Sequence, residues 1–260
     1  MRVVLLTHGG ADLVIKQLAM LKGVELVGVF IETATVPSRG RFEKLKRSIK
    51  YDGLIATAAK LAGRTAPPNS HSEDLTRLAA ADLGVTVADV ENYHSDDSVR
   101  ILKAANADLG VIYGTNIIKE SVFSIPKLGS INLHQGLAPF YRGGPPVFWE
   151  LFNDEHEVGL TAHFVAAKVD TGDIVLQTKV PLEYDGSFGL DFEAFIDNYR
   201  ARLREDSARL VASAVAAIAS GSNSRIPQDT NLGTRYRLPT KRQKDELRRR
   251  LKFRLSRGSE

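Results

Sequence analysis

An Asn and a His occupy alternate positions of a short apolar run that follows Gly129. Because side chains alternate along a strand, Asn132 and His134 would point to the same side, roughly 6–7 Å apart. An Asn amide can donate a hydrogen bond to an oxyanion, and a His can donate, accept or carry a proton near neutral pH. Gly136–Pro139 then breaks the strand at its carboxyl end, where ligands bind in open α/β sheets.

A carboxylate follows in a separate segment. Asp170 lies in a Gly-containing turn between two strand-like runs, Thr161–Ala167 and Ile174–Val180. An Asn, a His and an Asp from different loops are the usual combination of oxyanion donor, proton carrier and His-orienting carboxylate. A lone Asn-x-His pair is more often a structural polar pair than a catalytic one. The chemistry therefore depends on whether Asp170 reaches the other two residues.

Short motifs accompany these residues within positions 1–182: Tyr113-Gly114, Ile131–His134, Leu137–Pro139, Tyr141–Gly143, Gly159–His163 and Asp170–Ile174. In order and spacing they resemble the folate-dependent formyltransferases, which transfer a formyl group from 10-formyltetrahydrofolate to an amine. The resemblance implies an α/β, Rossmann-like fold: a mostly parallel twisted sheet with helices on both faces and an antiparallel hairpin portion. It also implies an enzyme that needs no metal.

The resemblance assigns the catalytic roles to Asn132, His134 and Asp170. A neutral amine would attack the formyl carbon directly, and negative charge would develop on the carbonyl oxygen of the tetrahedral intermediate. Asn132 and a protonated His134 would donate to that oxygen. Asp170 would favour the charged imidazole and help to move the amine proton.

The resemblance also implies where 10-formyltetrahydrofolate binds. In the family, the loop after the strand predicted at Asp108–Tyr113 holds the pterin ring, largely through backbone groups and an apolar wall. The same residues would also form the end of a strand and the start of a helix. The positions that match the cosubstrate site are Ile112, Tyr113, Gly114, Ile117, Ile118, Val169 and Asp173.

The loop after the first predicted strand lines the acceptor site in the family. For His8, a solvated turn residue is an equal alternative. His163 corresponds to a His that borders the active site, although a packed His bonded to the backbone is equally consistent with the sequence. The predicted substrate-binding residues are Thr7, His8, Gly9, Gly10 and Arg142.

Apolar runs and helical spacings predict the elements that position these residues. Arg2–Thr7, Asp12–Lys22 and Val24–Ile31 form a βαβ unit with a right-handed crossover. We expect a catalytic domain over residues 1–182, a long helix packed on it within 183–222, and a basic tail with a helical pattern over 223–260. The other main elements are strands at Val85–Val90 and Asp108–Tyr113, and helices at Glu73–Leu83, Asp96–Ala107, Ile117–Phe123, Val147–Asn153 and Asp191–Ile218.

The composition is that of a globular enzyme. Of 260 residues, 43% are hydrophobic and 25% charged, and the absence of Cys excludes disulfides and thiolate metal sites. No run approaches the ~18 apolar residues of a membrane span, and Met1–Thr7 is too short for a signal peptide, so we expect a cytoplasmic protein. The net charge of +4 is uneven, because residues 241–260 hold nine basic and three acidic residues. A second basic run, residues 39–50, would attract an anionic acceptor or form a solvated helix face.

The acceptor amine is the least determined part of the function. The run Arg142–Pro146 resembles the tRNA and amino-sugar branches of the family more than the glycinamide branch. About 40 residues follow the long helix, too few for the C-terminal domain of the tRNA-acting relatives. We therefore expect a nucleotide-linked amino sugar as a small-molecule partner, with no stable nucleic-acid complex. Phosphoribosylglycinamide and methionyl-tRNA are the alternatives.

The sequence also leaves open what the C-terminal segment contacts and whether the protein is a transferase. Lys241–Ser256 has Leu247, Leu251 and Leu255 at four-residue spacing among basic residues, which predicts a basic amphipathic helix. It would pack on the body of the chain or on the second subunit of a homodimer, or contact a membrane surface. The chain could also be a non-catalytic folate- or nucleotide-binding protein that retains the fold, or a hydrolase that transfers the formyl group to water.

Overall fold

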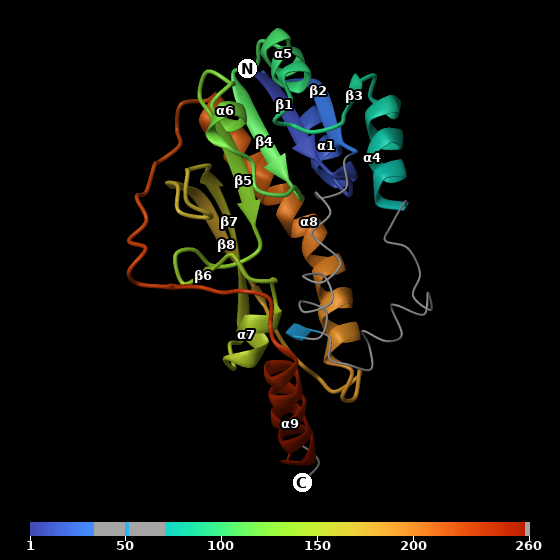
Figure 1. Cartoon of the computed structure of the whole chain (residues 1–260), viewed down its shortest axis with the longest axis vertical. Coiled ribbons are helices and arrows are strands. Elements are labelled where there is room, and N and C mark those ends of the chain that lie inside the picture. The colour runs from blue at the N-terminus through green and yellow to red at the C-terminus, as the bar shows by residue number, and fades with distance from the viewer. Residues whose placement is uncertain (34–49, 52–70, 258–260) are drawn as a thin grey trace.

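The computed structural model describes residues 1–33, 50–51 and 71–257. Its centre is a seven-stranded sheet in the order β3-β2-β1-β4-β5-β7-β8 (Figure 1). The first five strands of this order run parallel, and β7 is antiparallel to both β5 and β8. The predicted α/β, Rossmann-like fold with an antiparallel hairpin portion is confirmed. The strands are β1 (Arg2–Thr7), β2 (Glu25–Glu32), β3 (Val87–Val90), β4 (Leu109–Tyr113), β5 (Ser130–His134), β7 (Glu157–Phe164) and β8 (Ile174–Pro181).

Alternate residues of the central strands enter two separate cores, one on each face of the sheet. Val3 and Leu5 of β1 belong to the larger core, whereas Val4 and Leu6 belong to the smaller one. The apolar run is continuous because both faces of the strand are covered. The larger core lies under α1 (Asp12–Ala19), α4 (His71–Asp82) and α8 (Phe192–Ala219), and the smaller under α5 (Asp96–Ala104) and α6 (Glu120–Phe123).

The helix predicted from Ile117 begins three residues later, at Glu120. Lys119 has an extended backbone, and its N–H donates to Nε2 of His94 at 3.0 Å instead of entering a helical turn. Ile117 therefore stays in the loop after β4. Its side chain is 69% exposed, which leaves it available to line a cavity.

After α8 the chain returns past the sheet as an extended segment, residues 222–240, which we call the strap (Figure 1). Ile226 of the strap pairs with Ile174 of β8. Further along, β9 (Thr234–Arg235) pairs in parallel with β6 (Tyr141–Arg142), in the loop that precedes α7 (Phe148–Phe152). The strap therefore contacts both the hairpin and the loop after β5.

The predicted basic helix forms as α9 (Lys241–Arg257), which ends the described chain (Figure 1). Leu247 and Leu251 are fully buried, and Lys244 forms an ion pair with Glu193 of α8 at 2.9 Å. The helix thus packs on the body of the chain, and two of the three leucines of its predicted apolar face are covered. Within the described ranges, no helix combines the length and the apolar character that crossing a lipid bilayer requires.

One hydrophobic cluster joins the three predicted parts of the chain. Leu182, Phe192 and Leu247 come from the predicted catalytic domain, the long helix and the tail, and all belong to the larger core. The divisions of the chain at residues 182 and 222 stay predictions.

Candidate active site

The antiparallel pairing of β5 with β7 gathers polar residues at one end of the sheet. Asn132 lies opposite His163, and His134 lies opposite Thr161. Residues that pair directly across two strands project to the same side of the sheet. His163 therefore joins the two residues that alternation along β5 already places on one side.

Asp170 reaches this group from the turn between β7 and β8. Its Oδ2 lies 3.5 Å from Nδ1 of His134, and its Oδ1 lies 3.6 Å from Nε2 of His163. The N–H of Gly143 donates to Oδ2 at 2.9 Å. Asp170 has a φ of 53°, a left-handed conformation that Asp tolerates better than most residues. The structure thus brings the three predicted catalytic residues together, with His163 as a fourth member of the cluster.

Each imidazole of the cluster has one nitrogen bound to a backbone carbonyl. Nε2 of His134 donates to the carbonyl of Tyr141 at 2.7 Å, and Nδ1 of His163 donates to the carbonyl of Phe164 at 2.8 Å. In neutral rings the other nitrogen of each is an acceptor, and both of these nitrogens face the Asp170 carboxylate. Acceptor atoms that face one another repel, and burial of His134 opposes the uptake of a proton that would relieve this repulsion.

Burial and neighbouring charges set the ionisation of the cluster. Burial lowers the pKa of His134 below its usual value, and the charge of Asp170 only partly opposes this. Burial by itself would raise the pKa of Asp170, but the hydrogen bond with His163 and the charges of both imidazoles hold it below its usual range. At pH 7 Asp170 is therefore ionised and His134 neutral. The protonated His134 expected from the sequence is not favoured in this arrangement.

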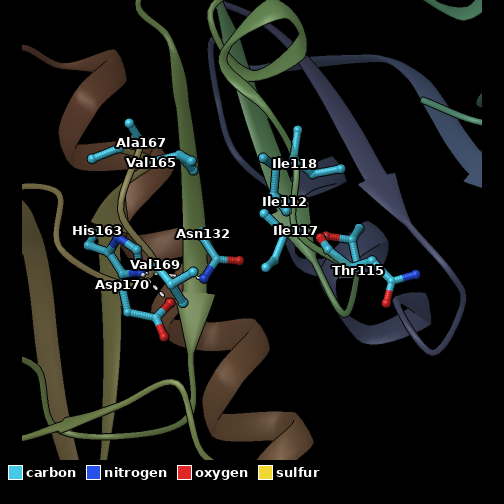
Figure 2. A pocket seen from close by; sticks show the side chains of 12 residues that line it. Ile112, Thr115, Ile117, Ile118, Asn132, His163, Val165, Ala167, Val169 and Asp170 are labelled. Atoms are coloured by element: carbon cyan, nitrogen blue, oxygen red, sulfur yellow. Dashed lines mark hydrogen bonds and ion pairs between the residues drawn. The ribbon is translucent and has the colours of Figure 1, made fainter. Parts of the chain in front are cut away.

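A cavity of about 150 Å³ lies beside the cluster, and we call it the inner cavity. Figure 2 shows its lining as two groups of side chains that face each other. One group comes from the end of β4 and the loop after it, where Ile112, Ile117 and Ile118 lie beside Thr115. The facing group includes Asn132 and Asp170 among small apolar side chains. Isoleucines opposite hydrogen-bonding side chains suit a flat ring with polar edges.

The residues matched to the cosubstrate site divide into two sets. Tyr113 packs against the larger core, and Gly114 turns the chain with a φ of 65°. The carbonyl of Asp173 accepts a hydrogen bond from the N–H of Phe164 at 2.8 Å. These three predicted residues shape the backbone around the inner cavity without lining it. The other four line the cavity: Ile112, Ile117, Ile118 and Val169.

The loop after β1 is held by its own hydrogen bonds. The side chain of Thr7 is fully buried, and its hydroxyl donates to the carbonyl of Gly9 at 3.0 Å. Nε2 of His8 lies 2.7 Å from Oε2 of Glu32, so His8 is paired with a carboxylate and is not simply a solvated turn residue. Gly9 and Gly10 have φ values of 120° and 69°, which glycine adopts without strain. The role of this loop toward an acceptor stays a prediction.

Arg142 does not face an open site. Its side chain is buried, its Nε donates to the carbonyl of Pro139 at 3.0 Å, and its Nη2 donates to the carbonyl of Thr230 at 2.9 Å. These bonds join the loop after β5 to the strap. These bonds give Arg142 a structural role, and its predicted contact with a substrate stays a prediction.

The strap holds both loops that carry the cluster. Nε2 of Gln228 donates to the carbonyl of Gly172 at 2.6 Å, two residues after Asp170. The indole N–H of Trp149 donates to the carbonyl of Arg237 at 2.9 Å. No local sequence pattern marks these residues, because each contact joins positions more than 50 residues apart.

Other residues of the site were predicted in part or not at all. The resemblance placed His163 at the border of the active site, but only the register between β5 and β7 shows that it contacts Asp170. Among the described residues, no group of His, Asp and Glu side chains is arranged to hold a metal ion. The remaining unpredicted residues that line the inner cavity are Thr115, Asn116, Val165, Ala166 and Ala167.

Comparison with known proteins agrees with this geometry. A sequence model of the family described as Formyl transferase matches residues 42–189, more than half of the chain. The chain belongs to the folate-dependent formyltransferase family. A methionyl-tRNA formyltransferase of Azobacteroides pseudotrichonymphae is 36% identical to this family member over 138 residues, which are 53% of this chain and 40% of that protein. A methionyl-tRNA formyltransferase of Bacteroides fragilis is 29% identical over 177 residues, 68% of this chain and 51% of that protein.

This formyltransferase family member spans about half the length of the curated relatives it matches. Among solved structures, a phosphoribosylglycinamide formyltransferase of Anaplasma phagocytophilum has a TM-score of 0.60 at 18% identity, covering 85% of this chain and 88% of that chain. A sugar N-formyltransferase of a Shewanella species has a TM-score of 0.57 at 16% identity, covering 92% and 77%. At these identities the likeness shows a shared fold.

Proposed function

We propose that the protein is an enzyme that transfers a formyl group from 10-formyltetrahydrofolate to a primary amine. The observation that carries the proposal is the meeting of Asn132, His134, His163 and Asp170 beside the inner cavity. Family membership supports it, because the matched residues 42–189 contain all four. Acceptor atoms that face one another lower the stability of the folded protein. Such a cluster is expected where it serves catalysis, and a protein that only binds folate would have no use for it.

The inner cavity has the chemistry that the folate cosubstrate requires. Ile112, Ile117 and Ile118 would contact the faces of its pterin ring, and the wall that includes Asn132 and Asp170 would face its polar edge. Apolar contact provides affinity, while a few placed polar groups fix orientation. When bound, 10-formyltetrahydrofolate supplies an activated formyl group.

Asn132 is placed to stabilise a developing oxyanion. Its Nδ2 lies 3.4 Å from Nε2 of His163, which accepts this weak hydrogen bond only while the ring is neutral. Because this bond is long and Asn132 also lines the inner cavity, its amide can turn to donate to the negative charge that forms as the amine attacks.

Asp170 is the acceptor we assign to the proton that the attacking amine loses, and it would return that proton to the folate nitrogen that leaves as its bond to the formyl carbon breaks. Its pKa lies below the usual range, so it is ionised near neutral pH. His134 acts through Asp170, because its Nε2 is bound to the Tyr141 carbonyl and its Nδ1 faces Oδ2 of Asp170. This arrangement replaces the direct oxyanion contact first expected of His134 with a positioning and proton-sharing role.

The acceptor with the most support is the amino group of methionyl-tRNA, one of the alternatives considered from the sequence. Both curated relatives described above are named methionyl-tRNA formyltransferases. The nucleotide-linked amino sugar was preferred because few residues follow the long helix. Since the chain spans about half the length of these relatives, that argument does not decide between the two acceptors.

Release of tetrahydrofolate, followed by absorbance, tests the proposed function. The full chain is incubated with 10-formyltetrahydrofolate and, separately, methionyl-tRNA, a nucleotide-linked amino sugar, phosphoribosylglycinamide or no amine. Release that needs one of the amines and is lost in Asn132→Ala supports formyl transfer. Release without any amine would indicate a hydrolase. Folate binding without release in any reaction would indicate a binding protein and would overturn the proposal.

A further inference from the structure

A second cavity, of about 360 Å³, lies where the strap meets α7 and the start of α9. Its lining includes Trp149 from α7, and Arg235, Tyr236 and Arg237 from the strap. Lys50, the one residue of the basic run 39–50 that the structure describes, also lines it. We call this space the basic cavity, because three cationic side chains and no Asp or Glu are found among its described lining residues.

The cations of the basic cavity differ from those of the neighbouring helix. In α9, Lys241 pairs with Asp245 at 2.8 Å, and Lys244 pairs with Glu193 at 2.9 Å. Arg235 and Arg237 are exposed, and within the part of the chain that the structure describes no ion pair joins either of them to a carboxylate. The positive charge of the basic cavity is thus not neutralised by those residues, so an anion would be attracted there.

The backbone beneath these arginines is held in place. Arg235 lies in β9 and pairs with Arg142 of β6, and the carbonyl of Arg237 accepts the indole N–H of Trp149 at 2.9 Å. The ring of Tyr236 stacks between Tyr141 and Trp149, with centroid distances of 5.2 and 4.8 Å. A guanidinium that projects from such a backbone loses less freedom on binding, which favours recognition of a fixed group.

The basic cavity lies next to the reaction centre. Trp149 and Tyr236 also line a much smaller cavity, of about 10 Å³, together with His134. Arg235 lies beside Gly143, since a Cβ added to that glycine would be 3.2 Å from Cγ of Arg235. The N–H of Gly143 in turn donates to Asp170 at 2.9 Å. One layer of residues therefore separates the arginines from the cluster.

We propose that the basic cavity binds a phosphate group of the acceptor, through Arg235 and Arg237, while the acceptor's amine reaches the cluster. This inference rests on the proposed function. Arginine presents paired N–H donors that match phosphate oxygens. A nucleotide-linked amino sugar and an aminoacylated tRNA both carry phosphate near the reactive amine, so the chemistry recognised is the same for either source.

Calorimetric titration of the full chain tests the proposal directly. The two probes are uridine diphosphate, and a short RNA oligonucleotide that ends in CCA. We expect at least one probe to bind, and the variant Arg235→Gln/Arg237→Gln to weaken that binding about tenfold or more. Binding of uridine diphosphate alone would identify a nucleotide as the source, and binding of the RNA alone would identify tRNA.

A matched control separates site binding from general charge attraction. Lys22→Gln/Lys103→Gln removes the same charge from two exposed residues that do not line the basic cavity, and it should leave the affinity unchanged. The proposal is overturned if neither probe binds the wild-type chain, or if the control weakens binding as much as the Arg235/Arg237 variant. Thermal unfolding of both variants verifies that each remains folded.

The same experiment distinguishes failure of this inference from failure of the proposed function. Probe binding that depends on both arginines, in a chain that transfers no formyl group, would leave the phosphate site intact and remove the enzyme assignment. Formyl transfer that proceeds with an unchanged acceptor KM in the Arg235→Gln/Arg237→Gln variant would support the enzyme assignment and remove the phosphate site.

Discussion

The inner cavity and the basic cavity lie on two sides of the same cluster and differ in nearly every physical property. The inner cavity has isoleucines on one wall, and its charged residue, Asp170, is almost buried. The basic cavity is lined by exposed arginines, and no carboxylate lies among its described lining residues. The first suits a flat, weakly charged ring, and the second suits an anion.

The difference indicates how two substrates could be kept apart at one reaction centre. A buried cavity selects by shape and by a few hydrogen bonds, and its contacts are screened little by salt. An exposed basic surface selects by charge, and its attraction falls as salt rises. Variants and conditions that affect one cavity should therefore leave the other nearly unchanged, which is the basis of the following tests.

The largest effect is expected for Asp170→Asn, which removes the proposed proton acceptor between the cavities. Asn tolerates the positive φ of this position and can still accept the N–H of Gly143. We expect kcat to fall about 10²–10⁴-fold, the usual contribution of a positioned acid or base, with little change in either KM. Near-normal turnover of a folded Asp170→Asn protein would remove Asp170 from the mechanism.

A smaller effect is expected for Ile117→Ala, which acts on the inner cavity alone. Ile117 is 69% exposed, so truncation should cost little stability, while a bound pterin would lose apolar contact. Ala lacks three of the carbons of Ile, and at about 0.8 kcal/mol per buried CH₂ the Kd for a pterin should rise by about tenfold to about 60-fold, according to how many of the three contact the ring. Leu128→Ala is the control, because Leu128 is 44% exposed and does not line the inner cavity. Equal losses in both variants would contradict the assignment.

Added salt should change the KM for a phosphate-bearing acceptor a few-fold more than it changes the Kd for a pterin. Raising NaCl from about 50 to about 300 mM shortens the range of charge interactions, so the KM for a phosphate-bearing acceptor should rise several-fold. Binding of a pterin that lacks the glutamate tail should change little. If both constants change together, the contrast between a shape-selective and a charge-selective cavity is wrong.

The last test measures stability and not activity, and it concerns Glu150, whose side chain lines the small cavity together with His134 and Tyr236. Burial raises the pKa of Glu150 to about 7 in the folded protein. Between pH ~4.5 and ~7 the folded state therefore holds a proton that the unfolded state has lost, so stability contributed by this residue falls as pH rises. Glu150→Gln should stabilise the protein by about 1–3 kcal/mol at pH ~8 and by almost nothing at pH ~4.5.

Urea unfolding of wild type and Glu150→Gln at both pH values measures this difference. Glu91→Gln is the control, because Glu91 is exposed and the substitution removes the same charge. A stability gain that is the same at both pH values would show that burial of an ionising group is not its cause.

Much of the fold followed from local patterns. Arg2–Thr7 was predicted as a strand covered on both faces because its apolar residues are continuous, and Val3 and Val4 do enter opposite cores. The predicted start of α6 was wrong because the side chain of His94, more than 20 residues earlier in the chain, binds the N–H of Lys119. A contact between distant segments decided that boundary, and helical spacing alone could not show it.

The site divides in the same way. Asn132 and His134 share a side because the strand period is two, and Asp170 was placed in its turn by the glycine near it. His163 joined the cluster only through the register of β5 against β7. Arg142 was expected to meet a substrate, but the strap supplies the carbonyls that bind its guanidinium.

The sequence by itself determined which side chains alternate and where most strands and helices occur, because these properties depend on neighbours within a few positions along the chain. Its resemblance to the family implied which residues could carry formyl transfer. Only the tertiary structure decided that two imidazoles share one carboxylate, that His134 turns its Nε2 to a carbonyl, and that Arg235 and Arg237 line a cavity next to that cluster. Each of these depends on strand register or on the path of the strap, which are set by packing between segments far apart in the sequence.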